Sequence, residues 1–315
     1  MPWTRSEQDM SELPRISVVI PTRNRAEDLV ECIRSVLRGG GFEELIVVDQ
    51  SDDRTTELAV AAIPDPRLRY LSSTLRGATN GRNVGIDASV GDVIAFTDDD
   101  CRVASDWIPS IARVFSADRE AAVVCGRVVV PEELAKKGYA VSFEPEIRDW
   151  QGRYPSPGHD WGITANFAAR RDVFTRIGTF DGVLGPGAPL LCGEETDFLF
   201  RVLRAGLKVV NAREVLVEHL GVRAHGAESS RLMRIYAAGA GAATFKHVRL
   251  ADLDGISIYV RHLGGCIRLI AINAVHLRRP VGIGFTLAFL SGAVASFKFR
   301  IDPKSRLYIS PQRAR

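Results

Sequence analysis

Three consecutive aspartates, Asp98, Asp99 and Asp100, follow the apolar run Val-Ile-Ala-Phe, which predicts a buried strand. Three adjacent carboxylates repel one another, so a folded chain must keep them hydrated or neutralise them. Open α/β sheets bind ligands at the C-terminal ends of their strands, where a divalent cation or a cationic ligand can neutralise such a cluster. The cluster therefore predicts a metal or ligand site, with an acidic solvated turn as the alternative on this stretch alone.

Two further polar residues follow predicted strands upstream. Thr22 comes after the apolar run at 16–20, and Asp49 comes after the run at 45–48. Because the carboxyl ends of parallel strands lie along one edge of a sheet, these side chains and the aspartates can line a single crevice. Arg82 adds a cation close by in the chain. Together these residues predict a nucleotide site.

The segments that must position these side chains alternate in type. Short β-branched runs predict strands covered on both faces, and amphipathic runs between them predict helices. Asn24 followed by Glu27 predicts a helix cap, and the glycines at 39–41 predict the end of that helix. This alternation is typical of βαβ units, so we expect a parallel, doubly wound sheet. The predicted strands are 16–20 (ended by Pro21), 45–48, 68–71, the run before Asp98, and 215–219; further predicted helices are about 55–62, 80–89 and 171–177.

Composition indicates a globular protein of a reducing compartment. The 315 residues, 46% apolar and 25% charged, suffice for one large domain or for a domain with an appendage. The five cysteines form no CxxC pair, which argues against a disulfide framework or a zinc site. Residues 1–13 are polar and lack the apolar core of a signal peptide, so we expect a loose tail over 1–14.

Charge is distributed unevenly along the chain. Residues 224–315 carry 14 Lys or Arg and 4 Asp or Glu, a net of +10, which leaves −7 for residues 1–223. This asymmetry suggests a catalytic part joined to a part that meets phosphates, membrane lipid or a partner. Nucleic acid is not the expected partner, because the basic residues are spread through apolar helical segments.

Several ordered segments resemble family 2 glycosyltransferases of the GT-A fold. The resemblance covers about residues 15–223. It is carried by Pro21-Thr22-Arg23-Asn24-Arg25, Val47-Val48-Asp49-Gln50-Ser51-Asp52-Asp53, Gly81-Arg82-Asn83-Val84-Gly85-Ile86, Phe96-Thr97-Asp98-Asp99-Asp100, Gly162-Ile163-Thr164-Ala165-Asn166-Phe167 (a small-residue strand), Ile177-Gly178-Thr179-Phe180-Asp181 (a G-x-F-D turn) and Gly193-Glu194-Glu195-Thr196-Asp197.

The resemblance implies a fold and an activity. The fold is α/β, a GT-A-type (Rossmann-like), mostly parallel sheet with flanking helices over 15–223, followed by a basic, apolar, helical region over 224–315. The activity is the inverting, metal-dependent transfer of a sugar from a nucleotide-diphosphate donor, a UDP-sugar by expectation, to a hydroxyl acceptor. A glycan or lipid-linked acceptor, in cell-surface polysaccharide or glycolipid assembly, is expected.

The resemblance also assigns a metal site. The DxD-like pair Asp98 and Asp100 matches the family's metal and diphosphate ligands, and His219 matches a position that completes this site in some relatives. Mg²⁺ or Mn²⁺ is expected, because either binds through few carboxylates plus phosphate oxygens and acts as a Lewis acid on the leaving group. An imidazole ligand suits Mn²⁺ better than Mg²⁺.

Donor contacts follow from the same motifs. Asp49 and Thr22 match positions that contact the nucleoside, and Asp99 lies nearer the sugar or ribose. Arg25 has a phosphate role or, as an alternative, a surface or helix-capping role. The full predicted set for the donor nucleotide is Pro21, Thr22, Arg25, Asp49, Asp53, Arg82, Asp98 and Asp99.

The predicted general base is a glutamate. The family carries an Asp where this chain has Glu195, so the base is Glu195, which role and geometry favour, or Glu194. A carboxylate at a helix N-terminus can take the acceptor's proton if apolar surroundings raise its pKa. Two helix-capping carboxylates, stabilised by the helix dipole, are the alternative.

The basic C-terminal region predicts helices around 256–277 and 281–297. The second has 17 residues without a charge, at the lower limit for a membrane span, and basic residues flank both its ends. It spans a membrane, lies on the cytoplasmic face of one as a peripheral anchor, or forms a soluble packing or homo-oligomer surface.

Two other functions compete with glycosyl transfer. A nucleotidyltransferase shares the sheet topology but normally carries a Gly-rich loop after the first strand, where this chain has Pro21 to Arg25 without glycine. A non-catalytic binding or scaffold subunit is left open by Glu195 in place of Asp.

Overall fold

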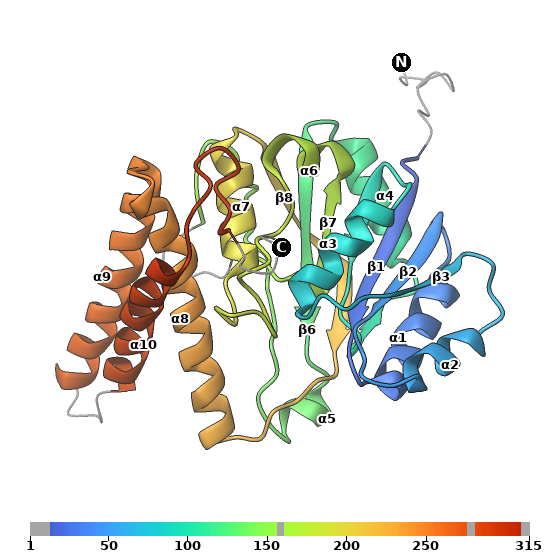
Figure 1. Cartoon of the computed structure of the whole chain (residues 1–315), viewed down its shortest axis with the longest axis horizontal. Helices are drawn as coiled ribbons and strands as arrows, with labels where there is room; N and C mark the ends of the chain where they lie inside the picture. The colour runs from blue at the N-terminus through green and yellow to red at the C-terminus, as the bar shows by residue number, and fades with distance from the viewer. Residues whose placement is uncertain (1–12, 156–160, 276–280, 310–315) are drawn as a thin grey trace, which may run out of the picture.

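We describe residues 13–155, 161–275 and 281–309 of a computed structural model of the chain (Figure 1). These residues contain one sheet of eight strands in the order β3-β2-β1-β4-β7-β6-β8-β5. Helices flank the sheet, and three C-terminal helices pack together at one end of it. The predicted α/β GT-A-type sheet with a helical C-terminal region is therefore confirmed. The strands are β1 (Ile16–Thr22), β2 (Glu44–Asp49), β3 (Leu68–Ser72), β4 (Val93–Phe96), β5 (Cys101–Val103), β6 (Ala121–Val129), β7 (Phe167–Arg170) and β8 (Lys208–His219).

Helices and strands alternate up to β4, and β5 follows β4 without a helix between them. The helices are α1 (Ala26–Gly39), α2 (Thr55–Ala61), α3 (Ala78–Ala88), α4 (Trp107–Ala117), α5 (Glu132–Ala135), α6 (Arg171–Ile177), α7 (Glu194–Arg204), α8 (Ala227–Arg249), α9 (Leu253–Val275) and α10 (Val281–Ala295), with 3₁₀ turns at Thr164–Asn166 and Ser296–Lys298.

The strand pairing changes from parallel to antiparallel halfway across the sheet. Strand β1 pairs in parallel with β2 and β4, and β2 pairs in parallel with β3, as the sequence predicts. Strand β7 runs antiparallel to both β4 and β6, and β5 runs antiparallel to β8. The parallel strands β1, β2 and β4 thus bring their C-terminal ends to one edge, and β5 returns from that edge beside the end of β8.

Three local predictions were wrong. Pro21 does not end β1, which continues to Thr22; Pro21 fits because β4 pairs with β1 only up to Val19, so no partner on that side needs its missing N–H. Asn24 does not cap α1: its φ is 55°, and its side chain bonds Asp52 instead (Nδ2 to Oδ2, 2.8 Å). The small-residue strand predicted at 162–167 is mostly a 3₁₀ turn, and the strand begins only at Phe167.

A cluster of phenylalanines joins the two halves of the sheet. Phe96 of β4 packs edge-on to Phe180 with ring centroids 5.6 Å apart, and Phe180 lies 4.5 Å from Phe198 of α7. Phe167 and Phe174 complete the cluster. All five rings are buried, so the G-x-F-D turn and α7 are fixed against the strand that carries the aspartates.

Helix α8 packs against α7 through buried charges. Lys246, with no exposed side-chain surface, places Nζ 2.7 Å from Asp181 Oδ2 and 2.5 Å from Asp197 Oδ1. His247 Nε2 lies 3.0 Å from the same Asp197 oxygen. The charges are mutually compensated, which is the condition for stable burial of ions.

The segment after α10 returns to this cluster. The backbone N–H of Tyr308 donates to Asp181 Oδ2 at 2.8 Å, and its hydroxyl donates to the carbonyl of Ala242 at 2.8 Å. Arg306 donates to Asp252 at 2.9 Å. Residues on both sides of the predicted boundary at 223 therefore share one buried network, and the division into two domains stays a prediction.

The outer helices α9 and α10 expose much apolar surface. Leu253 and Val260 of α9 are 81% and 58% exposed, and Leu287 of α10 is 62% exposed. In the part of the chain described, α9 is the one helix long and apolar enough to cross a membrane, judged by length and composition alone. Helix α10, for which a membrane span was one of three alternatives at 281–297, is shorter. The tail predicted over 1–14 lies outside the described residues except for Leu13 and Pro14.

Candidate active site

The C-terminal ends of β1, β2 and β4 bring the predicted donor residues together. Thr22 is the partner of Asp49 across β1 and β2. Its hydroxyl donates to Asp99 Oδ2 at 2.8 Å. Arg25, just before α1, donates to Asp99 Oδ1 at 3.1 Å and to Asp100 Oδ2 at 2.9 Å. Residues separated by more than seventy positions thus meet at one edge, as the strand order requires.

Asp99 points back into the protein. Burial raises its pKa to about 6, an effect that Arg25 opposes and Asp100 reinforces. Both of its oxygens are engaged, one by Thr22 and one by Arg25. This carboxylate therefore orients the loop after β1, and its contact with the ribose or sugar of a donor stays a prediction.

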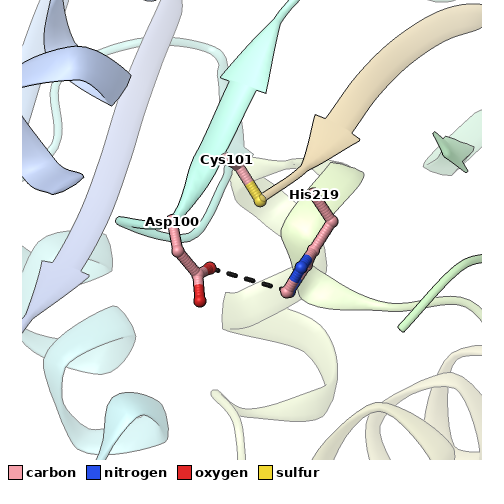
Figure 2. A group of neighbouring side chains, drawn as sticks. All are labelled: Asp100, Cys101 and His219. Atoms are coloured by element: carbon pink, nitrogen blue, oxygen red, sulfur yellow. Dashed lines mark ion pairs between the residues drawn. The ribbon is translucent and has the colours of Figure 1, made fainter. Parts of the chain in front are cut away.

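Asp100 and His219 form the clearest candidate for a metal site (Figure 2). Strands β5 and β8 pair so that Cys101 lies opposite His219, and His219 Nε2 is 3.6 Å from Asp100 Oδ1. The ligand atoms of Asp100, Cys101 and His219 all lie within 4.8 Å of one another. Figure 2 shows the carboxylate and the imidazole facing each other, with the thiol beside them.

The site fits a divalent ion of the predicted kind. His219 Nδ1 is buried without a hydrogen-bond partner. A Cβ on Gly221 would lie 2.2 Å from Asp100 Oδ2, so glycine leaves space around that oxygen. Burial, together with the charges of Asp98 and Asp100, raises the pKa of the Cys101 thiol well above its ordinary value. The carboxylate of Asp100 and the imidazole of His219 are ligands that suit Mn²⁺, with the Cys101 thiol beside them.

Asp98 is directed elsewhere. Its Oδ1 accepts a 2.6 Å hydrogen bond from Nη2 of the buried Arg82. Arg82 Nη1 lies 3.5 Å from Glu194 Oε1, so one guanidinium joins the aspartates to the first turn of α7. The structure does not bring Asp98 into the group formed by Asp100 and His219, and its role as a metal ligand stays a prediction.

The two glutamates occupy different environments. Helix α7 begins at Glu194, after Gly193 in the left-handed conformation (φ 97°). Glu194 is 2% exposed, and burial followed by the charge of Glu195 raises its pKa well above the ordinary value. Glu195 is more accessible and accepts hydrogen bonds from the Oγ1 and backbone N–H of Thr164, at 2.9 and 3.2 Å. One carboxylate is therefore buried against Arg82 and the other lies nearer the surface.

The remaining predicted donor residues divide into two groups. Asp49 accepts hydrogen bonds from the Tyr70 hydroxyl and the Ser51 backbone, both at 2.8 Å, at the strand edge. Pro21 is buried in β1, and a Cβ added to Gly81 of α3 would lie 2.9 Å from Pro21 Cβ. Asp53 is exposed and accepts a hydrogen bond from the Thr55 backbone at the start of α2, away from the bonds that join the aspartate cluster to Thr22 and Arg25. Asp53 is thus the weakest member of the predicted set.

Sequence reasoning missed two partners of the site. Tyr70 holds Asp49, and burial with this hydrogen bond raises the pKa of Tyr70 to about 12. Thr164 holds Glu195 although it lies in a segment expected to be a strand. The sequence around Tyr70 does not indicate which group its hydroxyl contacts. Thr164 lies in the segment 162–167 that resembles the family, and that segment was the signal that could have pointed to it.

Comparison with known proteins identifies the family. The sequence profile described as glycosyl transferase family 2 matches residues 17–178, just over half of the 315 residues. The chain is 25% identical over 221 residues to glycosyltransferase AglE of Haloferax volcanii, covering 66% of this chain and 68% of that protein. The glucosyl-dolichyl phosphate glucuronosyltransferase of the same organism is 28% identical over 220 residues, covering 65% and 69%.

Solved structures share the fold. A mannosyltransferase from Pyrobaculum calidifontis, solved with GDP-Man and Mn²⁺, superposes with a TM-score of 0.59 at 16% identity, covering 94% of this chain and 90% of that one. GalNAc-T7, solved with UDP, GalNAc and Mn²⁺, gives a TM-score of 0.52 at 18% identity, covering 74% of this chain and 48% of that one. With the profile match over the strands that carry the aspartates, these findings show that the chain belongs to glycosyl transferase family 2 and is a glycosyltransferase of the GT-A type.

Proposed function

We propose that this glycosyltransferase moves a sugar, with inversion, from a nucleotide-diphosphate donor to an acceptor hydroxyl. The observation that carries the proposal is the convergence of Asp100, His219 and Arg25 at the strand edge, with Arg82 connecting that edge to the glutamates of α7. This arrangement supports a cationic environment for a diphosphate beside a carboxylate that can receive a proton.

The donor side is assigned to the strand ends. Asp49 accepts from the nucleoside, and Thr22 and Pro21 form the adjoining wall. A Mg²⁺ or Mn²⁺ ion held by Asp100 and His219, with Asp98 as the predicted further ligand, would stabilise the charge on the departing diphosphate. Arg25 and Arg82 keep the clustered carboxylates compensated, and both offer N–H donors toward phosphate oxygens. A UDP-sugar is the proposed donor, and the two solved relatives bound to GDP and UDP nucleotides support a nucleotide donor in general.

The acceptor side is assigned to α7. Glu195 is the proposed general base, because it is the more accessible of the two glutamates and Thr164 fixes its orientation. Glu194 is proposed to hold Arg82 in place, since its buried Oε1 faces that guanidinium. The deprotonated hydroxyl attacks the anomeric carbon as the bond to the diphosphate oxygen breaks, and the proton passes to Glu195.

The C-terminal helices are proposed to hold the enzyme at a membrane surface. The exposed apolar residues of α9 and α10 support this, as does the +10 net charge of residues 224–315. A peripheral position on the cytoplasmic face would place the enzyme beside a glycan or lipid-linked acceptor. A second copy of the chain packed on the same face is the alternative occupant.

The experiment measures nucleoside diphosphate released from a panel of UDP- and GDP-sugars with Mn²⁺ present. Wild type is expected to release the nucleoside diphosphate of one donor, and His219→Ala to reduce the rate about 100-fold or more, because one of few metal ligands is gone. Cys101→Ala, beside His219, is the matched control and should retain activity, since it leaves the carboxylate of Asp100 and the imidazole of His219 in place. Equal loss in both variants, or release of pyrophosphate by nucleotidyl transfer, would contradict the proposal.

A further inference from the structure

A pocket of about 450 Å³ lies at the C-terminal end of β6, outside the residues assigned so far. Val128, Val129 and Val130 line one side, and the segment from Gly138 to Glu144 lines the other. The backbones of Val128 and Phe143 exchange two hydrogen bonds of 2.9 Å, which fixes the two sides together. Its volume is within the range of small-ligand sites.

The pocket adjoins the proposed metal pair. Strand β6 runs parallel to β8 with Val129 opposite Glu218, so the lining strand ends beside His219. The next residue, Leu220, donates its N–H to the carbonyl of Asp100 at 2.8 Å. Pocket and metal pair therefore share the same edge of the sheet, where α5 also lies (Figure 1).

The wall between them is thin. Arg223 exchanges backbone hydrogen bonds of 2.7 and 2.8 Å with the pocket residue Tyr139. A Cβ on Gly138, which also lines the pocket, would lie 2.6 Å from Val222 Cγ1. On the other side of the same short segment, a Cβ on Gly221 would lie 2.2 Å from Asp100 Oδ2. Two residues of chain thus separate the pocket lining from the carboxylate.

The lining is mainly apolar. Most of the lining residues are valine, alanine, tyrosine and phenylalanine. The more polar lining residues are Ser142, Glu144 and His225. Glu144 is paired with Arg127 at 2.7 Å and with Arg213 at 3.0 Å, so its charge is compensated at the protein surface. A bare sugar needs many hydrogen-bond partners, and this lining offers few.

We infer that this pocket holds an apolar aglycone of the acceptor, an alkyl, isoprenyl or aryl group attached to the sugar or alcohol whose hydroxyl is glycosylated. The inference rests on the proposed glycosyl transfer and deepens it by naming the acceptor class. The hydroxyl end then faces the edge that carries Asp100 and His219, and the aglycone lies along β6. Each methylene of an alkyl aglycone that is buried adds to the binding free energy, so an eight-carbon chain is expected to bind at least 10-fold more tightly than a methyl group.

The test uses two variants that fill the pocket. Ala135 and Ser142 line it from exposed positions, so Ala135→Trp and Ser142→Trp can obstruct it without disturbing the core. Lys137→Trp, at an exposed neighbouring position outside the lining, is the matched control. Binding of monomeric octyl and methyl β-glucosides is measured by saturation-transfer NMR, which needs no turnover. Wild type and Lys137→Trp should transfer saturation to the octyl protons. Both filling variants should weaken octyl glucoside binding at least 10-fold.

Competition identifies the source of the aglycone. Displacement of octyl glucoside by geranylgeranyl phosphate would assign a lipid-linked acceptor, and displacement by phenyl glucoside alone would assign a soluble one. An octyl signal that survives in both filling variants would belong to the exposed α9–α10 surface and would overturn the inference, as would equal binding of octyl and methyl glucosides. Release of nucleoside diphosphate without acceptor is measured on the same variants and should be unchanged. Its absence in wild type would count against the proposed function, not against the pocket.

Discussion

Glu194 and Glu195 are adjacent in sequence but differ in what they can contact. Glu194 faces Arg82 in a buried position, whereas Glu195 turns toward Thr164 nearer the surface. An acceptor hydroxyl can approach only the accessible carboxylate without displacing the protein. The proposed mechanism therefore depends on which of the two glutamates is accessible in the first turn of α7.

Substitution separates these two roles. Glu195→Gln is expected to lower kcat about 100- to 1,000-fold with little change in donor KM, because it removes the proton acceptor and leaves a side chain of the same shape. Glu194→Gln is expected to weaken donor binding first, since Arg82 loses the carboxyl group that faces it. Glu195→Asp restores a carboxylate and should recover part of the rate. Steady-state kinetics of the three variants check this. A larger kcat loss in Glu194→Gln than in Glu195→Gln would make Glu194 the general base.

At the scale of elements, the position of α7 is set by α8. A Cβ on Gly193, the residue before α7, would lie 2.6 Å from the carbonyl of Gly239 in α8. A Cβ on Gly239 would in turn lie 2.5 Å from Cys192 Cβ. Only glycines allow this approach, and Lys246 then ties the two helices through Asp197. Helix α8 is therefore expected to control the geometry of the glutamates although none of the predicted donor or metal residues lies on it.

Gly239→Ala tests this control. The added methyl group must push the backbone at Cys192, so we expect unfolding free energy to fall by about 1–3 kcal/mol and kcat to fall with it. Gly265→Ala in α9, where an added Cβ meets nothing within 4 Å, is the matched control. It should stabilise by about 0.5–1 kcal/mol, because alanine favours a helix interior over glycine. Urea unfolding and turnover of both variants give the answer, and equal effects would refute a specific role for α8.

The elements differed in how far the sequence could predict them. Strand β2 was predicted within one residue at each end, because its continuous Leu-Ile-Val-Val run signals a buried parallel strand. Strand β3 was predicted as closely, although its residues are only partly buried or exposed. Strand β5 has only three residues and no periodicity, so only its pairing with β8 defines it. Asn24 failed as a cap because a long-range partner, Asp52, competes for its side chain.

The site was predictable where short motifs carry it and unpredictable where tertiary contacts decide. Strand-end positions were enough to group Thr22, Asp49 and the aspartates. They could not reveal that Asp99 turns inward or that Asp98 pairs with Arg82, because both depend on residues brought from other elements. The proximity of His219 to Asp100 likewise depends on the antiparallel pairing of β5 and β8.

At the scale of the whole molecule, buried charges at the α7–α8 contact link stability to pH. Burial lowers the pKa of His247 to about 4, while Asp197 opposes this shift and Lys246 and Arg306 reinforce it. The ring also stacks on Phe200 at 3.9 Å. Desolvation likewise acts against the charged form of Asp197, but Lys246 and Arg201 outweigh it, so the pKa of Asp197 lies well below its ordinary value.

Both shifts destabilise the fold in acid. A histidine whose pKa falls on folding is neutral in the native state, so the unfolded chain binds the extra proton as pH falls from about 6.5 toward 4. We expect His247 to account for about 2 kcal/mol of lost stability by pH 5. His247→Gln cannot titrate, and its unfolding free energy should fall less between pH 7 and pH 5 than that of wild type. Identical slopes in urea titrations would show that His247 does not titrate in this way.

The outer face of α9 and α10 gives a second prediction at this scale. Val260→Glu with Ile267→Glu is expected to reduce cosedimentation with phosphatidylglycerol vesicles at least 10-fold, because both residues are exposed and apolar. Leu58→Glu, on the equally exposed Leu58 of α2, should have no effect. Added salt should weaken wild-type binding if basic residues contribute. Vesicle binding that survives the double substitution, or a concentration-dependent dimer that it abolishes, would favour another occupant of this face.

The return of Tyr308 to Asp181 also bears on the order in which the protein is made. Asp181 leaves the ribosome 127 residues before the backbone group that bonds it, and Lys246 follows it by 65 residues. During synthesis the G-x-F-D turn therefore waits with an uncompensated carboxylate until α8 emerges, and it gains its backbone partner only later still. Domains generally fold as units as the chain emerges, but here the second half of the catalytic sheet is expected to settle only after α8 and the segment that carries Tyr308 have emerged. A nascent chain stalled after α7 should accordingly be far more sensitive to protease than one stalled after Tyr308.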